Sequence, residues 1–345
     1  YISAKKMREN YDGNVFSPMG SSNFLLPFKS KDGNYKFEGR FNQGVVSINL
    51  PQIAIVSDGD EEKFWKLLDE RLDICYEALM CRHYALIGTL SDTSPIHWKY
   101  GAIARLKSGQ KIDELLKDGY STISLGYIGI YEVTKLMKGV SHTTSEGHDF
   151  AIKVMKKLEE TTKRWKKETG LGFGLYGIPS KSLSYRFAKI DKERFGIISD
   201  VTDKGYYTNS YHVDDREKMD VLKRLSFENE FQKLSLGGAL SYVEISDILE
   251  VAKERNEDPF VIVLDGIEDP HNLGSIIRTA ETAGVHGVII PKRRAVSVNS
   301  TVNKASAGAV EHMKIARVTN ISDAIEELKQ AGLWVCGTAV DTNKY

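Results

Sequence analysis

Residues 260–294 read FVIVLDGIEDPHNLGSIIRTAETAGVHGVIIPKRR, and this stretch decides the fold class of the C-terminal part of the chain. The apolar run at 260–264 predicts a buried strand, and apolar residues at helical spacing predict a helix over 273–283. A second strand is predicted at 288–290. Strands that alternate with helices at this spacing predict a parallel α/β layer.

The same alternation continues on both sides of this stretch. A helix is predicted before it at 246–255, and a helix at 321–330 with a strand at 333–336 is predicted after it. Because the texture of the chain changes at about residue 245, we expect two domains, residues 1–244 and 245–345. The length agrees, since 345 residues correspond to about two domains of ordinary size.

Composition excludes several classes of protein. Hydrophobic residues make up 41% of the chain and charged residues 27%, which excludes collagen, a coiled coil and wholesale disorder. Lys and Arg together number 47, as do Asp and Glu, so no net charge attracts the chain to nucleic acid or to an anionic membrane. No apolar run approaches the roughly 20 residues of a membrane span. We expect a cytoplasmic protein with no membrane partner.

Cysteine usage points to the same compartment. The chain has three cysteines and no CxxC pair, so neither a disulfide framework nor a four-cysteine zinc site is expected. We expect Cys75, Cys81 and Cys336 to be buried or half-buried thiols.

The first 244 residues also mix strand and helix patterns. The charge run KKLEETTKRWKKE at 156–168 is typical of the solvated face of a helix rather than of a nucleic-acid patch. The glycine-rich stretch 170–179 is expected to be a loop, and it lacks the Lys-Ser/Thr pair of a phosphate-binding P-loop. The other predicted elements are a strand at 44–50, a helix at 61–90, a buried strand within 119–131 and a helix at 148–169.

Six motifs in this part occur in the order of a known family. They are SPMGSSNFL (17–25), GRFNQGVVSINLPQIA (39–54), GYSTISLGYIGIYE (119–132), LYGIPSKSLSYRFAKIDKERFG (175–196), VTDKGYYTNSYHV (201–213) and FQKLSLGGALSYVE (231–244). Together they resemble the catalytic barrel of the class III anaerobic, glycyl-radical ribonucleoside-triphosphate reductases. The resemblance covers nearly all of residues 1–244. It implies part of a ten-stranded α/β barrel with a finger loop inside it.

The resemblance implies radical chemistry at the finger loop. In the family, a glycyl radical takes a hydrogen atom from a finger-loop cysteine, and the resulting thiyl radical attacks the ribose. Ser21 stands at the position of that cysteine. Because an O–H bond is much stronger than an S–H bond, we expect a reductase-like core that is inactive as it stands.

Other positions are implied to contact substrate. Asn42 matches an asparagine that faces the substrate ribose, where its amide can hydrogen-bond a hydroxyl group. The alternative is that Asn42 satisfies a buried turn. The loop 177–182, with Ser180 and Ser182, is implied to present N–H groups to substrate phosphates. Lys181 departs from the family, which often has glutamate there.

Cofactors and partners follow from the same resemblance. The family implies ribonucleoside triphosphates as substrates, a glycyl radical, a four-cysteine zinc site, a radical-SAM activase and a homodimer. The 345 residues contain no counterpart of the zinc and glycyl-radical segments. We therefore expect no complete cofactor in this chain.

The C-terminal part resembles a second family. Its motifs are residues 265–294 of the opening stretch, KASAGAVEHMKIARVTN (304–320) and GLWVCGTA (332–339). They resemble the SpoU family of RNA ribose 2′-O-methyltransferases, in the branch that methylates a 23S ribosomal RNA guanosine. The resemblance implies a trefoil-knot fold, S-adenosylmethionine as cofactor and ribosomal RNA as partner. The knot and cofactor loops have no counterpart here, so we expect a partial parallel α/β domain that lacks its knot.

Asn272 and Arg278 are implied to be active-site residues of this second domain. Asn272 is expected to cap the helix at 273–283. Arg278 is expected near the carboxyl ends of the parallel strands. Because arginine stays protonated, we expect it to position phosphate and the 2′-hydroxyl, with a base role only under the influence of a neighbouring group. The alternative is an exposed helical arginine.

Basic residues follow the second predicted strand. Lys292, Arg293 and Arg294 are expected to contact RNA phosphates. Glu311 and His312 are expected to be a polar pair at a helix end and not a metal site.

Three functions stay open. The first is an anaerobic reductase-like core, which covers the larger part of the chain. The second is a ribose 2′-O-methyltransferase that uses S-adenosylmethionine, carried by residues 245–345. The third is a non-catalytic nucleotide-binding protein or the product of a chimeric gene.

Overall fold

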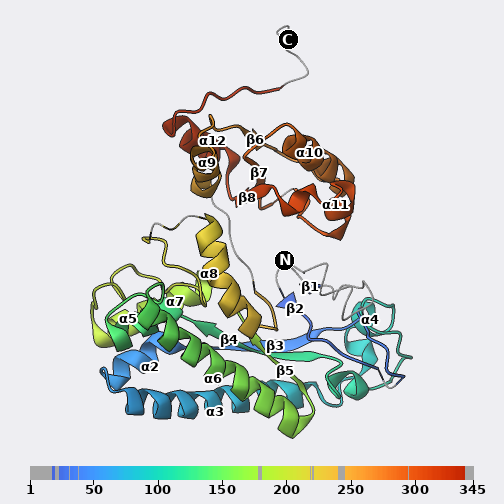
Figure 1. The fold of residues 1–345 in the computed structure, drawn as a ribbon. Helices are drawn as coiled ribbons and strands as arrows, with labels where there is room; N and C mark the ends of the chain where they lie inside the picture. Colours follow the sequence, from blue (N-terminus) through green and yellow to red (C-terminus); the bar gives the residue numbers. More distant parts are fainter. Residues whose placement is uncertain are drawn as a thin grey trace. The chain divides into compact units, whose positions relative to one another are not determined.

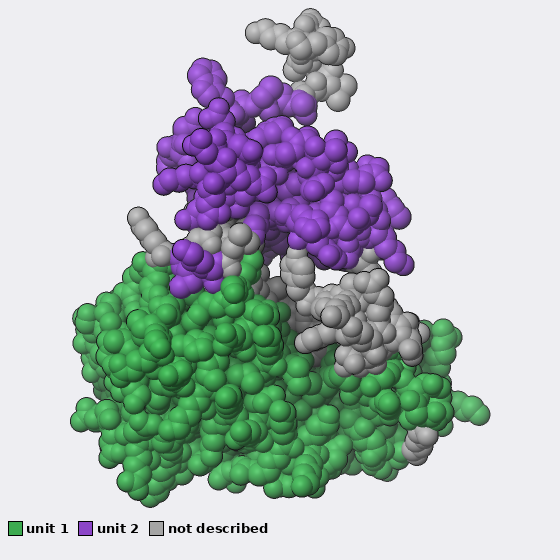
Figure 2. Space-filling view, in the orientation of Figure 1, with its two compact units in different colours: residues 1–218, 224–241 green, residues 219–223, 242–345 purple. Residues whose placement is uncertain are grey.

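The computed structural model describes residues 18–19, 23–30, 32–37, 39–177, 181–217, 219, 221–239, 245–293 and 295–338. The chain divides into two units (Figure 2): unit 1 is residues 1–218 and 224–241, and unit 2 is residues 219–223 and 242–345. Both units combine helices with parallel strands, as the sequence predicts.

Unit 1 contains a parallel three-stranded sheet in the order β3-β4-β5. Its register aligns Val46, Leu125 and Leu175 in the middle of the sheet. The strands are β3 (Asn42–Asn49), β4 (Thr122–Ile128) and β5 (Gly172–Tyr176).

The chain leaves the first two strands through helices. Asn49, the last residue of β3, caps α2 (Leu50–Ser57) by accepting a hydrogen bond from a main-chain N–H of the first turn. Pro51 lies in that turn, where its missing N–H costs nothing. Gly129 (φ 88°) turns β4 into α5 (Ile130–Lys138), and a Cβ there would lie 2.3 Å from the Pro51 ring. The proline that ends the predicted strand therefore also begins a helix.

Two long helices cover one face of the sheet. α3 (Glu61–Leu86) packs on β3 and β4, and α6 (Ser145–Thr169) packs on β5; both lie below the sheet in Figure 1. Gly170 (φ 71°) ends α6 in the left-handed conformation that glycine adopts freely. Leu158 and Trp165 are buried, so the charge run of this helix is its solvated face, as predicted.

The glycine-rich stretch 170–179 holds β5, so the prediction of a loop there is wrong. A Cβ on Gly172 would lie 2.4 Å from the carbonyl oxygen of Ser121, and a Cβ on Gly174 would lie 2.9 Å from Cδ1 of Leu26. These glycines allow close approach of neighbouring segments to a strand.

A short hairpin precedes the sheet in the chain. β1 (Pro18–Met19) and β2 (Asn23–Phe24) pair antiparallel. In Figure 1 they lie on the side of the sheet opposite α3 and α6. This is the segment that the family resemblance implies to be the finger loop. Ser21 falls between the two strands, outside the described residues.

The remaining elements before residue 241 are short segments and two further helices. They are η1 (Ser91–Thr93), α4 (Pro95–Trp98), η2 (Asp113–Leu116), α7 (Lys181–Phe195) and α8 (Val221–Leu234).

Unit 2 contains a second parallel three-stranded sheet, in the order β6-β7-β8. Its register aligns Val263, Ile289 and Ala316. The elements are α9 (Ile245–Glu254), β6 (Val261–Val263), α10 (Pro270–Thr282), β7 (Gly287–Pro291), α11 (Ser300–Ala305), η3 (Ala309–Glu311), β8 (Lys314–Val318) and α12 (Ile321–Gln330).

Two strand predictions in unit 2 need correction. Residues 333–336 form no strand: the segment after α12 is irregular, and Trp334 is 100% exposed. β6 is shorter than predicted and half-buried rather than buried, with Phe260 51% exposed just before it. β6 is the edge strand of its sheet, so only one side is covered by a neighbour. Among the residues that the structure describes, no helix is long and apolar enough to cross a membrane.

Candidate functional site

The two faces of the unit 1 sheet differ in chemistry. Side chains alternate along a strand, so every second residue faces α3 and α6. The helix side carries large apolar side chains of the core, Ile48, Ile123, Leu125, Phe173 and Leu175. The opposite face carries mostly small and polar residues, together with Val45 and Tyr176; the small and polar ones are Asn42, Ser47, Thr122, Ser124, Gly126, Gly172 and Gly174. We call this second set the polar face.

Asn42 is the centre of hydrogen bonding on the polar face. Its Nδ2 donates to Oγ of Ser124 at 2.6 Å, and its Oδ1 accepts from the main-chain N–H of Gly44 at 2.7 Å. Each atom still has capacity for a second hydrogen bond, because the amide has two N–H groups and two oxygen lone pairs. The internal bonds fit the buried-turn alternative, and the unused capacity leaves a substrate role open.

A β-bulge sets the position of this amide. The register with β4 shifts between Asn42 and Gly44, and Gly44 has φ 154°. A Cβ on Gly44 would lie 2.3 Å from Nε of Arg82, so a side chain there would have to displace the guanidinium group of Arg82. A β-bulge changes the direction of the side chains beside it. Here it brings the N–H of Gly44 within hydrogen-bond distance of the Asn42 side chain and so orients that amide.

The next residue, Gln43, points to the other side and anchors the strand in the interior. Its Nε2 donates to Oγ of Ser121 at 2.7 Å, and its Oε1 lies 2.8 Å from Nδ1 of His83. Because Oε1 accepts only, His83 Nδ1 carries the proton. Burial lowers the pKa of His83, which keeps this ring neutral.

One buried hydroxyl group on the polar face has no partner among the described residues. Thr122 is 2% exposed, and its Oγ1 makes no hydrogen bond with any described residue. A buried hydroxyl normally has a hydrogen-bond partner, so the Thr122 hydroxyl is an exception in the strand register beside Asn42.

The predicted phosphate-binding residues lie elsewhere or outside the description. Ser180 falls in the gap 178–180, outside the described residues, as does Ser21, the position of the family cysteine, in the gap 20–22. Ser182 is exposed in the first turn of α7, after the carboxyl end of β5. Asn42 is the first residue of β3, whereas Ser182 follows the last residue of β5. Because the strands are parallel, Asn42 lies at their amino ends and Ser182 beyond their carboxyl ends.

A buried carboxylate fixes α7 to the carboxyl end of β3. Asp191 is 0% exposed and accepts hydrogen bonds from Nδ2 of Asn49 at 2.8 Å, Nε2 of Gln52 at 2.6 Å and the hydroxyl of Tyr207 at 2.9 Å. Burial, with the nearby Asp191, raises the pKa of Tyr207. Three neutral donors satisfy this carboxylate, so it is a structural anchor.

A buried ion cluster lies beyond the carboxyl end of β4. Nζ of Lys204 lies 2.9 Å from Oε1 of Glu132 and also contacts Asp214, and both acids are buried. Burial opposes ionisation of Asp214, but Arg216 and Lys204 outweigh it and lower its pKa to about 2. Thr208 adds its N–H to Glu132 at 2.7 Å. The cluster ties the loop after α7 to α5.

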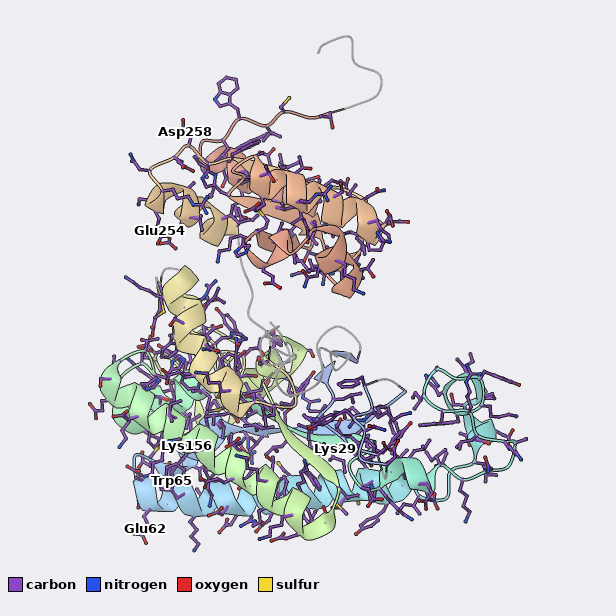
Figure 3. All side chains as sticks on the ribbon, turned by 45° about the vertical axis from the view of Figure 1, so that its right-hand side comes forward. Lys29, Glu62, Trp65, Lys156, Glu254 and Asp258 are labelled. Atoms are coloured by element: carbon purple, nitrogen blue, oxygen red, sulfur yellow. The ribbon has the colours of Figure 1, made fainter. Side chains whose placement is uncertain are left out.

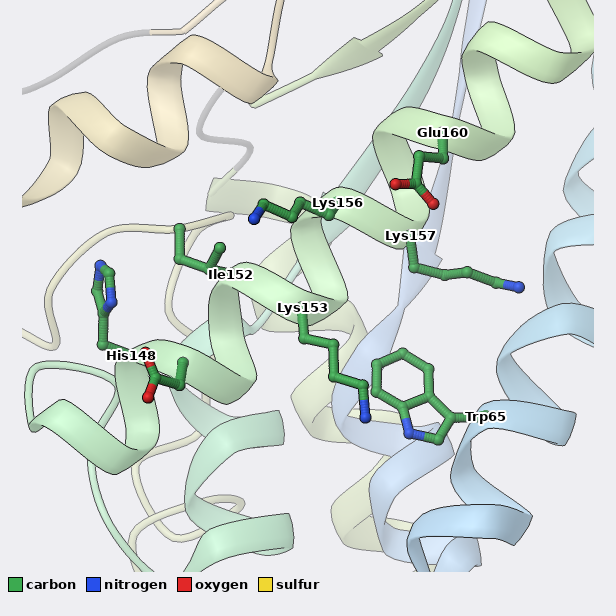
Figure 4. A pocket seen from close by; sticks show the side chains of 8 residues that line it. Trp65, His148, Ile152, Lys153, Lys156, Lys157 and Glu160 are labelled. Carbon is green, nitrogen blue, oxygen red and sulfur yellow. The ribbon is translucent and has the colours of Figure 1, made fainter.

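A shallow groove on the helical side of unit 1 carries charge but no site chemistry (Figures 3 and 4). Lys153 of α6 reaches Trp65 of α3, with Nζ 4.7 Å from the ring centre, and pairs with Glu61 at 2.9 Å. Lys157 pairs with Asp69 at 2.7 Å. These exposed pairs contribute little energy, and the groove lies on the face of the unit away from Asn42.

Unit 2 corrects the prediction for Asn272. The helix cap is Asp269, whose carboxylate accepts from the N–H of Asn272 at 2.9 Å, and Pro270 begins α10. Asn272 is therefore inside the first turn and exposed. Arg278 is exposed two turns further on, and its side chain makes no hydrogen bond or ion pair with a described residue, which fits the alternative of an exposed helical arginine.

Basic residues gather at the carboxyl end of β7. Lys292 and Arg293 are exposed directly after the strand, and Arg294 lies outside the described residues. Arg317 of β8, which the sequence motifs do not single out, donates to the carbonyl oxygen of Lys292 at 3.2 Å. The strand register is what reveals Arg317 as a member of this basic set, because it pairs with Ile290, one residue before the end of β7.

Thiols and metal ligands give two further outcomes. Cys75 is buried as expected, and burial raises its pKa to about 11; Cys81 and Cys336 are exposed, which corrects the expectation for both. His312 follows η3 directly, as expected of a helix-end residue. Within the described ranges, no cluster of three or more His, Cys, Asp or Glu side chains is arranged to hold a metal ion.

Comparisons with known proteins match two parts of the chain to two families, and the reductase match extends into α9 of unit 2. The family "Anaerobic ribonucleoside-triphosphate reductase" matches residues 1–255, and the SpoU rRNA methylase family matches residues 259–345. The anaerobic ribonucleoside-triphosphate reductase of Enterobacteria phage T4 is 42% identical over 253 residues, which is 72% of this chain and 40% of that protein. A putative TrmH family tRNA/rRNA methyltransferase of Bacillus subtilis is 56% identical over 100 residues, 29% of this chain and 40% of that protein.

A solved structure gives a weaker likeness. The anaerobic ribonucleotide reductase from Thermotoga maritima, with citrate in the active site, is 21% identical with a TM-score of 0.48, covering 61% of this chain and 36% of that one. The chain spans about two fifths of the length of the curated relatives it matches.

The fold class of this protein is mixed α/β, with one parallel three-stranded sheet in each of its two units. The reductase family model matches more than half of the chain, so the chain belongs to the anaerobic ribonucleoside-triphosphate reductase family. Its last part is similar to the SpoU rRNA methylase family.

Proposed function

We propose that unit 1 is a reductase-like core that binds ribonucleotides on its polar face. The observation that carries the proposal is the Asn42 amide, which Ser124 and the Gly44 N–H hold in one orientation while leaving one N–H and one lone pair unused. A ribose hydroxyl both donates and accepts, so it matches this amide. The unpaired Thr122 hydroxyl lies on the same face.

The three strands of unit 1 form part of a ten-stranded α/β barrel in this proposal, and the β1-β2 hairpin is its finger loop. Supporting this, the hairpin and the helices lie on opposite sides of the sheet (Figure 1), and the face toward the hairpin is the polar one.

Radical transfer through residue 21 is not part of the proposed function. Ser21 replaces the thiol that the family oxidises, and a glycyl radical does not remove hydrogen from an alcohol O–H. The core therefore binds nucleotide without forming a radical at that residue. The family's zinc site does not fit the described residues, which contain no suitable ligand cluster.

Titration calorimetry with ribonucleoside triphosphates tests the proposal. Replacing Asn42→Ala removes about one hydrogen bond to the ribose, so we expect affinity to fall about fivefold. Asn34→Ala is the matched control, because Asn34 is exposed and its side-chain amide bonds Asp32, outside the polar face. Absence of ribonucleotide binding by the unaltered chain, or equal affinity of both variants, contradicts the proposal.

For unit 2 we propose contact with RNA phosphates by Lys292, Arg293 and Arg317, in a SpoU-type ribose methyltransferase region. The supporting observation is that three cationic side chains share the carboxyl end of neighbouring parallel strands, where ligand sites of α/β sheets gather. Arg278 is exposed and free to position a phosphate. S-adenosylmethionine is the cofactor that the SpoU resemblance implies, and we assign no step to it.

The salt dependence of RNA binding tests this second proposal. Replacing Arg293→Gln removes one phosphate contact, which is expected to weaken binding and reduce the slope of log affinity against log salt by about one. Lys329→Gln on α12 is the control, since Lys329 pairs with Glu326 and lies outside the basic set. An unchanged slope for Arg293→Gln argues against the assignment.

A further inference from the structure

Arg40 is a buried cation whose hydrogen bonds all go to main-chain carbonyl groups. It is 3% exposed. Its Nη1 donates to the carbonyl oxygen of Leu26 at 2.7 Å, Nη2 to that of Gly119 at 2.9 Å, and Nε to that of Tyr120 at 2.7 Å. No described carboxylate forms an ion pair with it.

Burying a charge without an opposite charge is costly, and the cost is visible here. Burial lowers the pKa of Arg40 to about 10, so the guanidinium remains charged at neutral pH. Only the three carbonyl dipoles and the ring of Phe28, 5.2 Å away, compensate it among the described residues. An apolar residue would fill the same space without this cost.

The three carbonyl groups come from two segments that are far apart in the sequence. Leu26 is just beyond β2, at the exit of the hairpin, and Gly119 and Tyr120 lead into β4. Tyr120 adds a second connection between these segments, because its hydroxyl donates a hydrogen bond to the carbonyl oxygen of Gly39, the residue before Arg40. The bonds therefore close a loop between the hairpin exit, the start of β3 and the start of β4.

The Leu26 side chain also contacts the polar face of the sheet, at Gly174 of β5. Its Cδ1 lies where a Cβ on Gly174 would be only 2.9 Å away, so Leu26 sits directly on β5. Leu26 is also five positions after residue 21. The grip on its carbonyl thus limits how far the hairpin can move from the sheet.

We propose that Arg40 is a positioning residue that holds the hairpin exit against the polar face. Its fork of N–H groups, which lysine lacks, fixes the hairpin exit and the β4 entrance relative to Asn42, two residues away. The proposal rests on the proposed nucleotide site for its functional consequence, whereas its structural part stands independently.

Hydrogen exchange of the full chain tests the structural part. In Arg40→Lys we expect the amides of residues 23–30 to exchange about tenfold faster, because two charge-assisted bonds are lost. The amides of β4 and α6 should change by less than about twofold. Arg71→Lys, at an exposed position of α3, is the control and should leave every segment unchanged.

Tyr120→Phe provides a second variant in case Arg40→Lys folds poorly. It removes only the hydroxyl bond to Gly39 and should loosen residues 23–30 to a smaller degree. Unchanged exchange in residues 23–30 overturns the proposal for either variant. Equal acceleration in β4 and α6 overturns it as well, because Arg40 would then be a general stabiliser.

Ribonucleoside triphosphate affinity tests the functional part separately. Arg40→Lys should weaken binding relative to the unaltered chain and to Arg71→Lys, measured at a temperature at which both variants are folded. If the unaltered chain binds no ribonucleotide, the proposed function fails while the exchange result still decides the positioning role. If binding occurs and Arg40→Lys matches the unaltered chain, the functional part of the positioning role fails.

Discussion

The side-chain amide of Asn42 in β3 donates a hydrogen bond to the hydroxyl oxygen of Ser124 in β4 at 2.6 Å. This bond crosses between strands on the face that the helices leave uncovered. Together with the Gly44 N–H at 2.7 Å, it fixes the direction of the amide. Preorganised polar groups of this kind lower the cost of binding, since no side chain has to be ordered afterwards.

Replacing Ser124→Ala is expected to release this amide. Loss of one hydrogen bond should reduce the free energy of unfolding by about 1 kcal/mol, measured by urea denaturation. Ribonucleotide affinity should fall as well, since Asn42 then samples other orientations. Ser47→Ala is the control on the same face, because no described residue bonds its hydroxyl. An equal loss of affinity in both variants would show that the Asn42–Ser124 bond is not the cause.

Two glycines of β5 predict a graded response to alanine. In Gly172→Ala the new Cβ meets the Ser121 carbonyl oxygen at 2.4 Å, and backbone cannot yield cheaply. In Gly174→Ala it meets the flexible end of Leu26 at 2.9 Å. We expect Gly172→Ala to cost about 3 kcal/mol of unfolding free energy and Gly174→Ala about 1 kcal/mol. Thermal or urea unfolding gives the order, and the reverse order would contradict the packing described here.

His142 predicts a pH dependence of stability. The ring is 0% exposed among Tyr131, Phe227 and Phe231, and its Nε2 lies 3.1 Å from the Tyr211 carbonyl oxygen. Burial lowers its pKa from 6.5 to about 4. The unfolded chain therefore binds a proton below pH 6.5 that the folded chain accepts only near pH 4, so stability falls as the pH is lowered through this window.

The size of this effect can be isolated by mutation. Between pH 7 and pH 4 the histidine should account for a loss of about 3 kcal/mol in unfolding free energy. His142→Gln keeps a donor for the Tyr211 carbonyl group and should flatten the profile by that amount. His97→Gln, at an exposed position, should leave the profile unchanged. Parallel profiles for the unaltered chain and His142→Gln would refute the assignment.

The three thiols should separate by reactivity. Cys81 and Cys336 are exposed, whereas Cys75 is buried and its pKa is raised to about 11. Because the thiolate is the reactive form, alkylation at pH 8 should label two thiols rapidly and the third only on unfolding. Peptide mass spectrometry identifies the sites. Rapid labelling of Cys75 in the native chain would show that the α3 packing is looser than described.

Sequence periodicity is sufficient to predict most of the elements and part of the polar face. The alternation in TISLGYI (122–128) separates Ile123 and Leu125 from Thr122 and Ser124, so the amino-acid sequence by itself distinguishes the two faces of β4. The same reasoning misses β5, because its glycines look like loop residues when the segment that approaches them, Leu26, is far away in the sequence.

Two other features, the cap of α10 and the hydrogen-bond partners of Arg40, cannot be read correctly from the local sequence. Asn272 looks like a helix cap because asparagine is a good one, but Asp269 followed by Pro270 is a stronger signal and is the cap observed. The partners of Arg40 are main-chain oxygens, which every residue has, so no sequence pattern points to them.

The choice of acceptor by Arg40 has an evolutionary consequence. Every amino acid carries a carbonyl oxygen, so a substitution at position 26 or 120 leaves the acceptor of the guanidinium in place, whereas Gly119, with φ 75°, favours glycine for its own backbone conformation. Arg40 is the residue whose side chain must be conserved to keep these three hydrogen bonds. A lineage can therefore diversify the residues around the hairpin while the path of its backbone is preserved.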